Sequence, residues 1–343
     1  MKMLRIKPLS FAALLFTFFH THTIAQTELT ADGFYSEGAA AQDRNDFQQA
    51  IRFYTAVIDK DTYHAKALFN RALCYIEQGK YYLAAQDFQK YLDIEPNDKA
   101  ALEMYGNMAF LNGKLDLAIY QYSLLLELET NPVVLLNRAL AYFQNKQMEK
   151  ARVDFENLKT LQPDNALIYN YLGEISAAGD NYELAFENFK KALELDGSDA
   201  VILNNYGRYL AKAGNYQEAM TQFDKAIKIA PQSALFANRA LAELEMDNLE
   251  KARTDAQTAI DLDFKNAQAY YTMGKIEFRA GNYFDAVEYF KMACDIQPAE
   301  PAYFFALGLA HLSRQEKEDA NIAFQQVFEM APDFPELKKY LTK

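Results

Sequence analysis

The chain has 343 residues, half of them hydrophobic, and a formal net charge of −12. So acidic a surface repels phosphate backbones and anionic headgroups, which disfavours nucleic-acid binding and adsorption to anionic membranes. The two cysteines, Cys74 and Cys294, are separated by more than half of the chain. We expect them to be small buried residues, because no disulfide or metal site can be built from so distant a pair.

The first 25 residues predict a secretory signal peptide. A basic start precedes an apolar stretch from Leu9 to Phe19, and the string TIA ending at Ala25 is a small-x-small exit. The apolar stretch has 11 residues, whereas a membrane anchor needs about 20. We therefore predict cleavage after Ala25 and an exported protein, periplasmic or secreted, in a bacterium. Cleavage would remove three positive charges and no acids, taking the net charge from −12 to −15.

From residue 31 onward one period of 33 or 34 residues fills the chain. It is marked by an alanine in each unit, at Ala50, Ala84, Ala118, Ala151, Ala185, Ala219, Ala252, Ala286 and Ala320. Four residues after the marker stands an aromatic residue, except in the seventh unit, where it is Ala256. Twelve residues before the marker stands Gly or Ala. The spacing predicts two amphipathic helices per unit, packed where a small residue meets an aromatic one.

The prolines test this register independently. Five of them fall between units, at Pro96, Pro163, Pro231, Pro298 and Pro332. Pro132 and Pro301 fall at the first residue of a unit, where a helix tolerates a missing N–H. Glycines at 79, 113, 214 and 281 share position 15 of their units and predict left-handed turns between the two helices.

This pattern resembles the tetratricopeptide repeat (TPR) family over about residues 31–334. The sixth unit, 200–232, follows the family pattern closely, with Tyr206, Gly207, Ala219 and Phe223 in place. The resemblance implies an all-α fold: a right-handed α-solenoid (superhelix) of about nine helix-turn-helix units with a C-terminal capping helix. The predicted segments are the signal peptide 1–25, an array 26–334 and the capping helix 335–343, in which Leu337 and Leu341 face the last repeat. The nine repeats are 31–64, 65–98, 99–131, 132–165, 166–199, 200–232, 233–266, 267–300 and 301–334.

The resemblance also implies that the first helices line a concave groove, with positions 2, 5, 6, 9, 12 and 13 of each unit facing inward. Position 6 is Asn in four units, at Asn70, Asn137, Asn205 and Asn238. An amide both donates and accepts, so these residues are predicted to hold the backbone of an extended peptide. The alternative is that Asn at this position only supports the helix surface.

Two further sets of side chains are predicted to line the groove. The first is aromatic, at position 5: Tyr35, Phe69, Tyr271 and Phe305. These would anchor a partner, or belong to the core instead. The second is basic: Arg208, Lys212, Lys275 and Arg279. These would receive a carboxylate, or form a solvated face neutralised by Glu174 and Glu245.

Nothing in the repeats predicts catalysis. Beyond the signal peptide the only histidines are His64 and His311, about seven repeats apart, and no Gly-rich phosphate loop is present. We predict no enzyme activity, no cofactor and no metal.

The predicted function is a protein–protein interaction scaffold that binds an extended peptide or a partner helix in the concave groove. It would neither bind nucleic acid nor insert its mature chain in a membrane. The alternative is a structural subunit of a bacterial cell-envelope or secretion assembly, docked through its outer surface. A third interpretation, an adaptor for a wall-modifying enzyme, has no feature in its favour.

Overall fold

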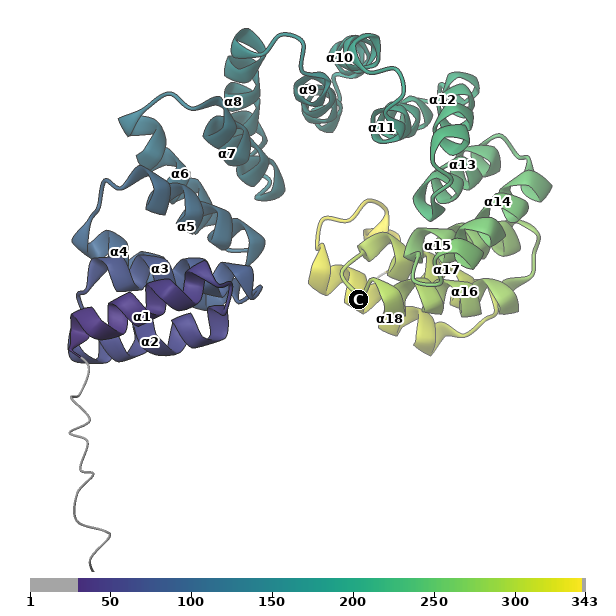
Figure 1. Cartoon of the computed structure of the whole chain (residues 1–343). Helices are drawn as coiled ribbons and strands as arrows, with labels where there is room; N and C mark the ends of the chain where they lie inside the picture. Colours follow the sequence, from purple (N-terminus) through teal and green to yellow (C-terminus); the bar gives the residue numbers. More distant parts are fainter. Residues whose placement is uncertain (1–29, 341–343) are drawn as a thin grey trace, which may run out of the picture. The chain divides into compact units, whose positions relative to one another are not determined.

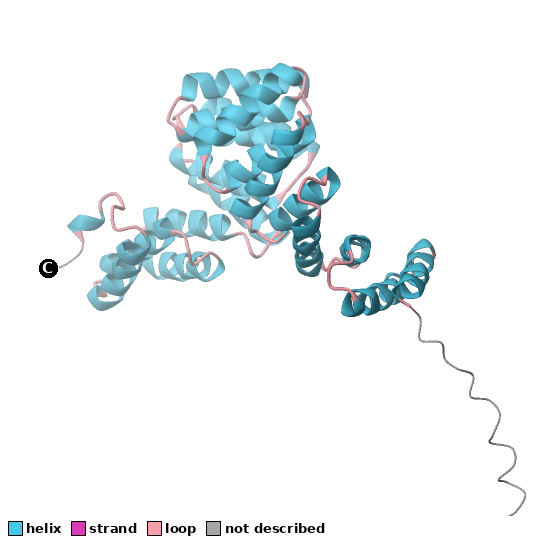
Figure 2. Cartoon of the chain, turned by 90° about the vertical axis from the view of Figure 1, so that its left-hand side faces the viewer, coloured by secondary structure: helices cyan, strands magenta, loops and turns pink. Residues whose placement is uncertain are grey.

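The computed structural model describes residues 30–340, and the predicted signal peptide and Leu341 lie outside that range. Within it the chain forms 18 α-helices and no strand, which confirms the all-α prediction (Figures 1 and 2). The chain divides into two compact units, unit 1 up to Lys146 and unit 2 from Gln147. The boundary falls between the two helices of the repeat predicted at 132–165, so each unit is described by itself.

Unit 1 consists of three helix pairs followed by one further helix. Its helices are α1 (Ala31–Asp43), α2 (Phe47–Lys60), α3 (Ala65–Glu77), α4 (Tyr81–Ile94), α5 (Lys99–Leu111), α6 (Leu115–Leu128) and α7 (Pro132–Gln144). Each helix packs against the next one along the chain, as expected of a solenoid of repeats.

Unit 2 begins with one helix and continues with five pairs. Its helices are α8 (Met148–Leu161), α9 (Ala166–Ala178), α10 (Tyr182–Leu195), α11 (Ala200–Lys212), α12 (Tyr216–Ile229), α13 (Ser233–Glu245), α14 (Leu249–Leu262), α15 (Ala267–Arg279), α16 (Tyr283–Ile296), α17 (Pro301–Ser313) and α18 (Lys317–Met330). Figure 1 shows α11, α13 and α15 on the inner side of this unit and α12, α14 and α16 on its outer side.

Local chemistry sets both ends of these helices. Asp98, Asn165 and Asp199 cap α5, α9 and α11 by accepting backbone N–H groups of the first turn. The turn between two paired helices has one residue of positive φ at position 15 in every repeat. Glycine supplies it at 79, 113, 214 and 281, with φ between 68° and 85°, and polar residues such as Asp180 supply it elsewhere.

The core repeats one contact between a small residue of the first helix and an aromatic ring of the second. In α11 a Cβ added at Gly207 would lie 2.7 Å from the Phe223 ring of α12, and that ring is fully buried. Only a very small residue lets the two helices come so close. The seventh repeat has Ala240 and Ala256 in these places, and Met273 of the next repeat packs into the same cluster.

Arginines at position 7 join three repeats to their predecessors, and in one of them Arg138 donates to Ser123 at 3.2 Å. Arg71 binds Asp87 of its own repeat through two bonds of 2.7 Å and Thr55 of the preceding repeat at 3.0 Å. Arg239 binds Asp255 in the same bidentate way, at 2.7 and 2.8 Å, and Asp224 of the preceding repeat at 2.6 Å. One guanidinium thus ties three helices together.

The C-terminal segment differs from the capping helix predicted for 335–343. Its described part forms only a 3-10 turn, Leu337–Lys339, because Glu336 adopts a left-handed conformation with φ 69° that an α-helix cannot contain. Leu337 is fully buried and Tyr340 stacks on Phe324 at 5.0 Å, so the segment still covers the last repeat. Within residues 30–340 no helix is both long and apolar enough to cross a membrane.

Candidate functional site: the groove of unit 2

Two adjoining cavities of unit 2 form a groove along its first helices. The first, of about 470 Å³, is lined by residues of α11, α13, α15 and α17, together with Tyr216 and Phe223 of α12. The second, of about 310 Å³, is lined by α15, α17, Phe290 of α16 and Phe334 of the terminal segment. Tyr271 and Lys275 of α15 border both cavities, so the two lie side by side. We call them the polar cavity and the aromatic cavity.

The four predicted cations lie together in this groove. Arg208, Lys212 and Lys275 line the polar cavity, and Lys275 and Arg279 line the aromatic one. Arg208 and Lys212 lie on α11, Lys275 and Arg279 lie on α15, and the first helix α13 stands between them. Within each pair the two cations are about one helical turn apart, so one face of each helix presents both of them.

Two glutamates pair with three of these cations, as the alternative interpretation expected. Glu245 accepts from Lys275 Nζ at 2.7 Å and from Arg279 at 3.1 Å, while Glu174 accepts from Arg208 at 3.1 Å. Burial by itself would raise the pKa of Glu245, but the bonds and charges of Lys275 and Arg279 lower it overall. Burial does raise the pKa of Glu174, against the opposing effect of Arg208.

The aromatic residues of unit 2 pack partly on the core and partly into the groove. Tyr271 lies 5.8 Å from Phe290 and 4.8 Å from Tyr303 between ring centres, and it borders both cavities. Burial raises the pKa of Tyr303 to about 12, so its hydroxyl stays neutral at physiological pH. Phe305 lines the aromatic cavity and contacts Phe324 and Phe334. Both predicted anchors, Tyr271 and Phe305, therefore serve the core and the groove at once.

The asparagines at position 6 bind the preceding repeat. In unit 2, Asn205 donates to Asn170 at 3.2 Å and to Glu174 at 3.0 Å. Asn238 donates to Asn204 at 2.8 Å and accepts from Gln268 at 2.9 Å. Of the two, Asn238 also lines the polar cavity. These bonds support the alternative in which the amides stabilise the helix surface.

The remaining four predicted site residues lie in unit 1. Asn70 donates to the Tyr35 hydroxyl at 2.9 Å, and Asn137 donates to Asn107 at 3.3 Å. Tyr35 and Phe69 pack on the aromatic residues of their own second helices, Tyr54 and Phe88. Between α5, α6 and α7, Asn137 lines a small cavity of about 110 Å³ with Asn107, Phe110, Leu111 and Tyr122.

Family profiles for tetratricopeptide repeats match residues 35–99, 133–165, 164–232 and 238–301, which together make up more than half of the chain. The chain belongs to the tetratricopeptide repeat family. It is 26% identical over 275 residues to the Hsp70-Hsp90 organizing protein of Triticum aestivum, covering 76% of this chain and 40% of that protein. It is 38% identical over 95 residues to tetratricopeptide repeat protein 12 of Homo sapiens, covering 27% of this chain and 14% of that protein. The chain thus spans well under half the length of both relatives.

Solved structures share the fold. The crystal structure of a tetratricopeptide repeat protein from Parabacteroides merdae superposes with a TM-score of 0.59 at 22% identity, covering 81% of this chain and 97% of that one. The APC/C hetero-tetramer Cut9-Hcn1 superposes with a TM-score of 0.60 at 14% identity, covering 91% of this chain and 75% of that one.

The prediction from the sequence did not include all of the residues that line the groove of this TPR chain. Leu241 and Gln268 occupy positions 9 and 2, both predicted to face inward, so the positional rule could have found them. Tyr303 at position 3 and Phe334 beyond the last helix carried no such signal. Their place depends on how α17 and the terminal turn pack.

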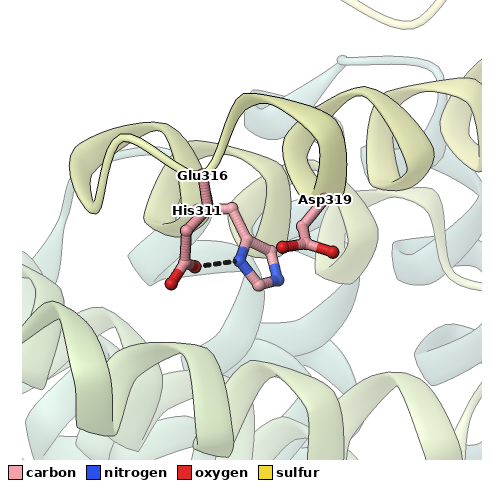
Figure 3. Close-up of side chains that lie close together, drawn as sticks. All are labelled: His311, Glu316 and Asp319. Atoms are coloured by element: carbon pink, nitrogen blue, oxygen red, sulfur yellow. Dashed lines mark hydrogen bonds and ion pairs between the residues drawn. The ribbon is translucent and has the colours of Figure 1, made fainter.

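One cluster of possible metal ligands lies at the corner between α17 and α18 (Figure 3). The ligand atoms of His311, Glu316 and Asp319 all lie within 4.8 Å of one another, although no metal was predicted. His311 Nδ1 and Glu316 Oε2 are 2.7 Å apart. His311 and Glu316 occupy positions 11 and 16 of their repeat. In two other repeats a hydrogen bond joins the residues at these positions: Asn248 donates to Glu243, and Asn282 donates to Glu277. The His311–Glu316 contact in the last repeat is thus equivalent to a hydrogen bond that recurs between the paired helices of other repeats.

Proposed function

We propose that this TPR protein is an interaction scaffold that binds an extended peptide or a partner helix in the groove of unit 2. TPR proteins act as protein-interaction scaffolds, and the chain's repeats belong to that family. The observation that carries the proposal is that the polar and aromatic cavities adjoin and together extend along α11, α13, α15 and α17. A groove that crosses four repeats suits an elongated ligand better than a compact one.

The lining of the groove supports a polypeptide ligand. Lys212, Glu245 and Gln268 offer donors and acceptors beside the apolar surfaces of Leu241 and Tyr271. Peptide recognition uses this mixture, since the ligand backbone needs polar partners and its side chains need apolar pockets. The wheat relative's name, an organizer of Hsp70 and Hsp90, also denotes a protein that binds proteins.

The proposal is tested by site-specific photocrosslinking in intact cells. A photoreactive phenylalanine analogue would replace Lys212, which lines the groove on α11, or Lys225, which is exposed on α12 and lines no cavity of the groove. We expect a discrete crosslinked protein partner at Lys212 and none at Lys225. Crosslinking at Lys225 alone would contradict groove binding and favour docking through the outer surface.

A further inference from the structure

We propose that the partner segment carries a bulky apolar side chain, which enters the aromatic cavity, and a nearby carboxylate, which binds the cations of the polar cavity. This inference rests on the proposed function and specifies its ligand. It is carried by three observations: the lining of the aromatic cavity, the fixed position of its outer wall, and the surplus of positive charge beside it.

The aromatic cavity is built for an apolar group. Phe278, Phe290, Phe305, Leu309 and Phe334 line its floor and walls, and Ala302 and Ala306 leave room for a side chain to enter. Its volume of about 310 Å³ exceeds that of a single large side chain. Transfer of a Leu or Phe side chain from water into such a cavity favours binding because it buries apolar surface.

The outer wall of this cavity is held in place without a ligand. Phe334 lies 5.1 Å from Phe305 between ring centres. The turn that follows is anchored by the fully buried Leu337 and by Tyr340, which contacts Phe305 at 5.7 Å and Phe324 at 5.0 Å. A preformed wall lowers the entropy cost of binding. The terminal segment therefore completes a ligand site as well as covering the last repeat.

The charge beside the aromatic cavity favours an anion. Arg208, Lys212, Lys275 and Arg279 face the groove, and Glu174 and Glu245 are the acidic partners that pair with them. Lys212 is exposed, lines the polar cavity and makes no ion pair within residues 30–340. This leaves a local surplus of positive charge in a chain whose formal net charge is −12.

Lys275 joins the two subsites. Its ammonium lies 5.7 Å from the centre of the Tyr271 ring, and both residues border the two cavities. A ligand carboxylate that reaches Lys212 or Lys275 therefore lies only a few residues from a side chain in the aromatic cavity. We infer an extended segment in which one large apolar residue and one acidic residue are close in sequence.

The experiment uses the chain from Gln26 onward and a defined peptide array. Each peptide has one Leu or Phe and one Asp, separated by one to six residues, in a Gly/Ser background. Matched peptides replace the apolar residue by Ser, or Asp by Asn or Lys. The tightest binder is then measured in solution by fluorescence anisotropy, with a free and an amidated C-terminus. We expect either replacement to weaken binding at least tenfold.

Two variants place the peptide in the groove. Lys212→Glu should weaken binding of the Asp peptide about tenfold and leave the Asn peptide unchanged. Ala306→Trp fills the aromatic cavity and should weaken binding of every Leu or Phe peptide. Lys225→Glu on α12 and Ile322→Trp on α18 make the same chemical changes at exposed outer positions and should have no effect.

The outcomes separate this inference from the proposed function. If crosslinks form at Lys212 but the preferred peptides lack the acidic or the apolar residue, the ligand chemistry is wrong and the groove scaffold stands. If the chain instead self-associates and Ala306→Trp abolishes that association, a second copy occupies the cavity and the inference is overturned. Dependence on a free C-terminus would identify the carboxylate as a chain end, and its absence as an Asp side chain; both support the inference.

Discussion

At the level of single residues, Glu245 neutralises part of the positive charge in the groove. It lies at the end of α13, and its carboxylate holds both Lys275 and Arg279 of the next repeat. The two cations would otherwise face the groove without a counter-ion and repel each other. The glutamate thus fixes Lys275 at the border of the two cavities, whereas Lys212 forms no ion pair among the described residues 30–340.

The pH dependence of stability should report this contact. The pKa of Glu245 is lowered in the folded chain, so its contribution to the free energy of unfolding is present above about pH 4.5 and is lost as the pH falls through the folded pKa. We expect Glu245→Gln to lower the free energy of unfolding by about 0.5–1 kcal/mol at pH 7. Urea denaturation at pH 7 and pH 3 should show the difference from wild type shrinking at the lower pH. Glu149→Gln, in an exposed pair with Arg152, is the control; a difference that grows on acidification would contradict the assignment.

The asparagines at position 6 bind the preceding repeat, so a binding experiment on Asn→Ala variants also reports a loss of stability. Asn205 and Asn238 each donate to the preceding repeat, and each such bond contributes about 1 kcal/mol. An Asn→Ala variant that loses a partner has therefore lost stability as well. Their role in holding a ligand backbone stays a prediction, whereas their role between repeats is visible in the structure.

At the level of helices, the arginines at position 7 form largely buried ion pairs between elements. Arg239 and Asp255 form a bidentate pair whose side chains are 20% and 10% exposed. Such a pair is costly to break from one side because the remaining charge stays largely buried without its partner. The contact also fixes α13 against α14, and α13 presents Leu241 and Glu245 to the groove.

Arg239→Ala should therefore lower the free energy of unfolding by about 3 kcal/mol. Arg152→Ala removes an exposed pair with Glu149 and should leave the free energy of unfolding unchanged within the error of the measurement. Replacing Arg239 by Met together with Asp255 by Leu should recover most of the loss, since the only charge left without its partner is that of Asp224, which is 53% exposed. Urea denaturation followed by far-UV circular dichroism measures all three. An equal loss of unfolding free energy in Arg239→Ala and Arg152→Ala would contradict the argument that burial makes the Arg239–Asp255 pair costly to break.

At the level of the whole molecule, the chain is a repeat protein whose described residues form two compact units. Stability in such arrays is roughly a sum of contributions within repeats and between neighbours. The groove of unit 2 needs four consecutive repeats and the terminal turn, so it depends on several of these neighbour contacts at once.

Export is a prediction at the same scale. In a bacterial host we expect the protein in the periplasmic fraction, beginning at Gln26, because residues 1–25 have the three parts of a signal peptide. N-terminal sequencing and intact-mass measurement check this. Leu15→Arg interrupts the apolar stretch and should leave full-length protein in the cytoplasm. Wild-type protein that keeps its N-terminus there would contradict the prediction.

The sequence alone determined the class of the fold. Several features depend on contacts within one repeat: the helix pair, the small residue opposite an aromatic one, and the left-handed turn. Because the pattern occurs in nine copies, its period and these features can be recognised in the sequence. It also identified the cations, one amide and two aromatic residues of the groove of unit 2, because inward-facing positions recur in every repeat: Arg208, Lys212, Lys275, Arg279, Asn238, Tyr271 and Phe305. The left-handed conformation of Glu336, after which the described part of the terminal segment forms the 3-10 turn Leu337–Lys339, has no local signal in the sequence.

Only the tertiary structure decided which of these residues share a site and with what they pair. Asn205 reaches Glu174, Lys275 reaches Glu245, and Phe334 meets Phe305 across gaps of about one repeat length in sequence. Such contacts depend on how neighbouring repeats stack, and a periodic sequence describes each repeat without fixing the stacking. Only the three-dimensional structure therefore showed the groove, which consists of the adjoining polar and aromatic cavities.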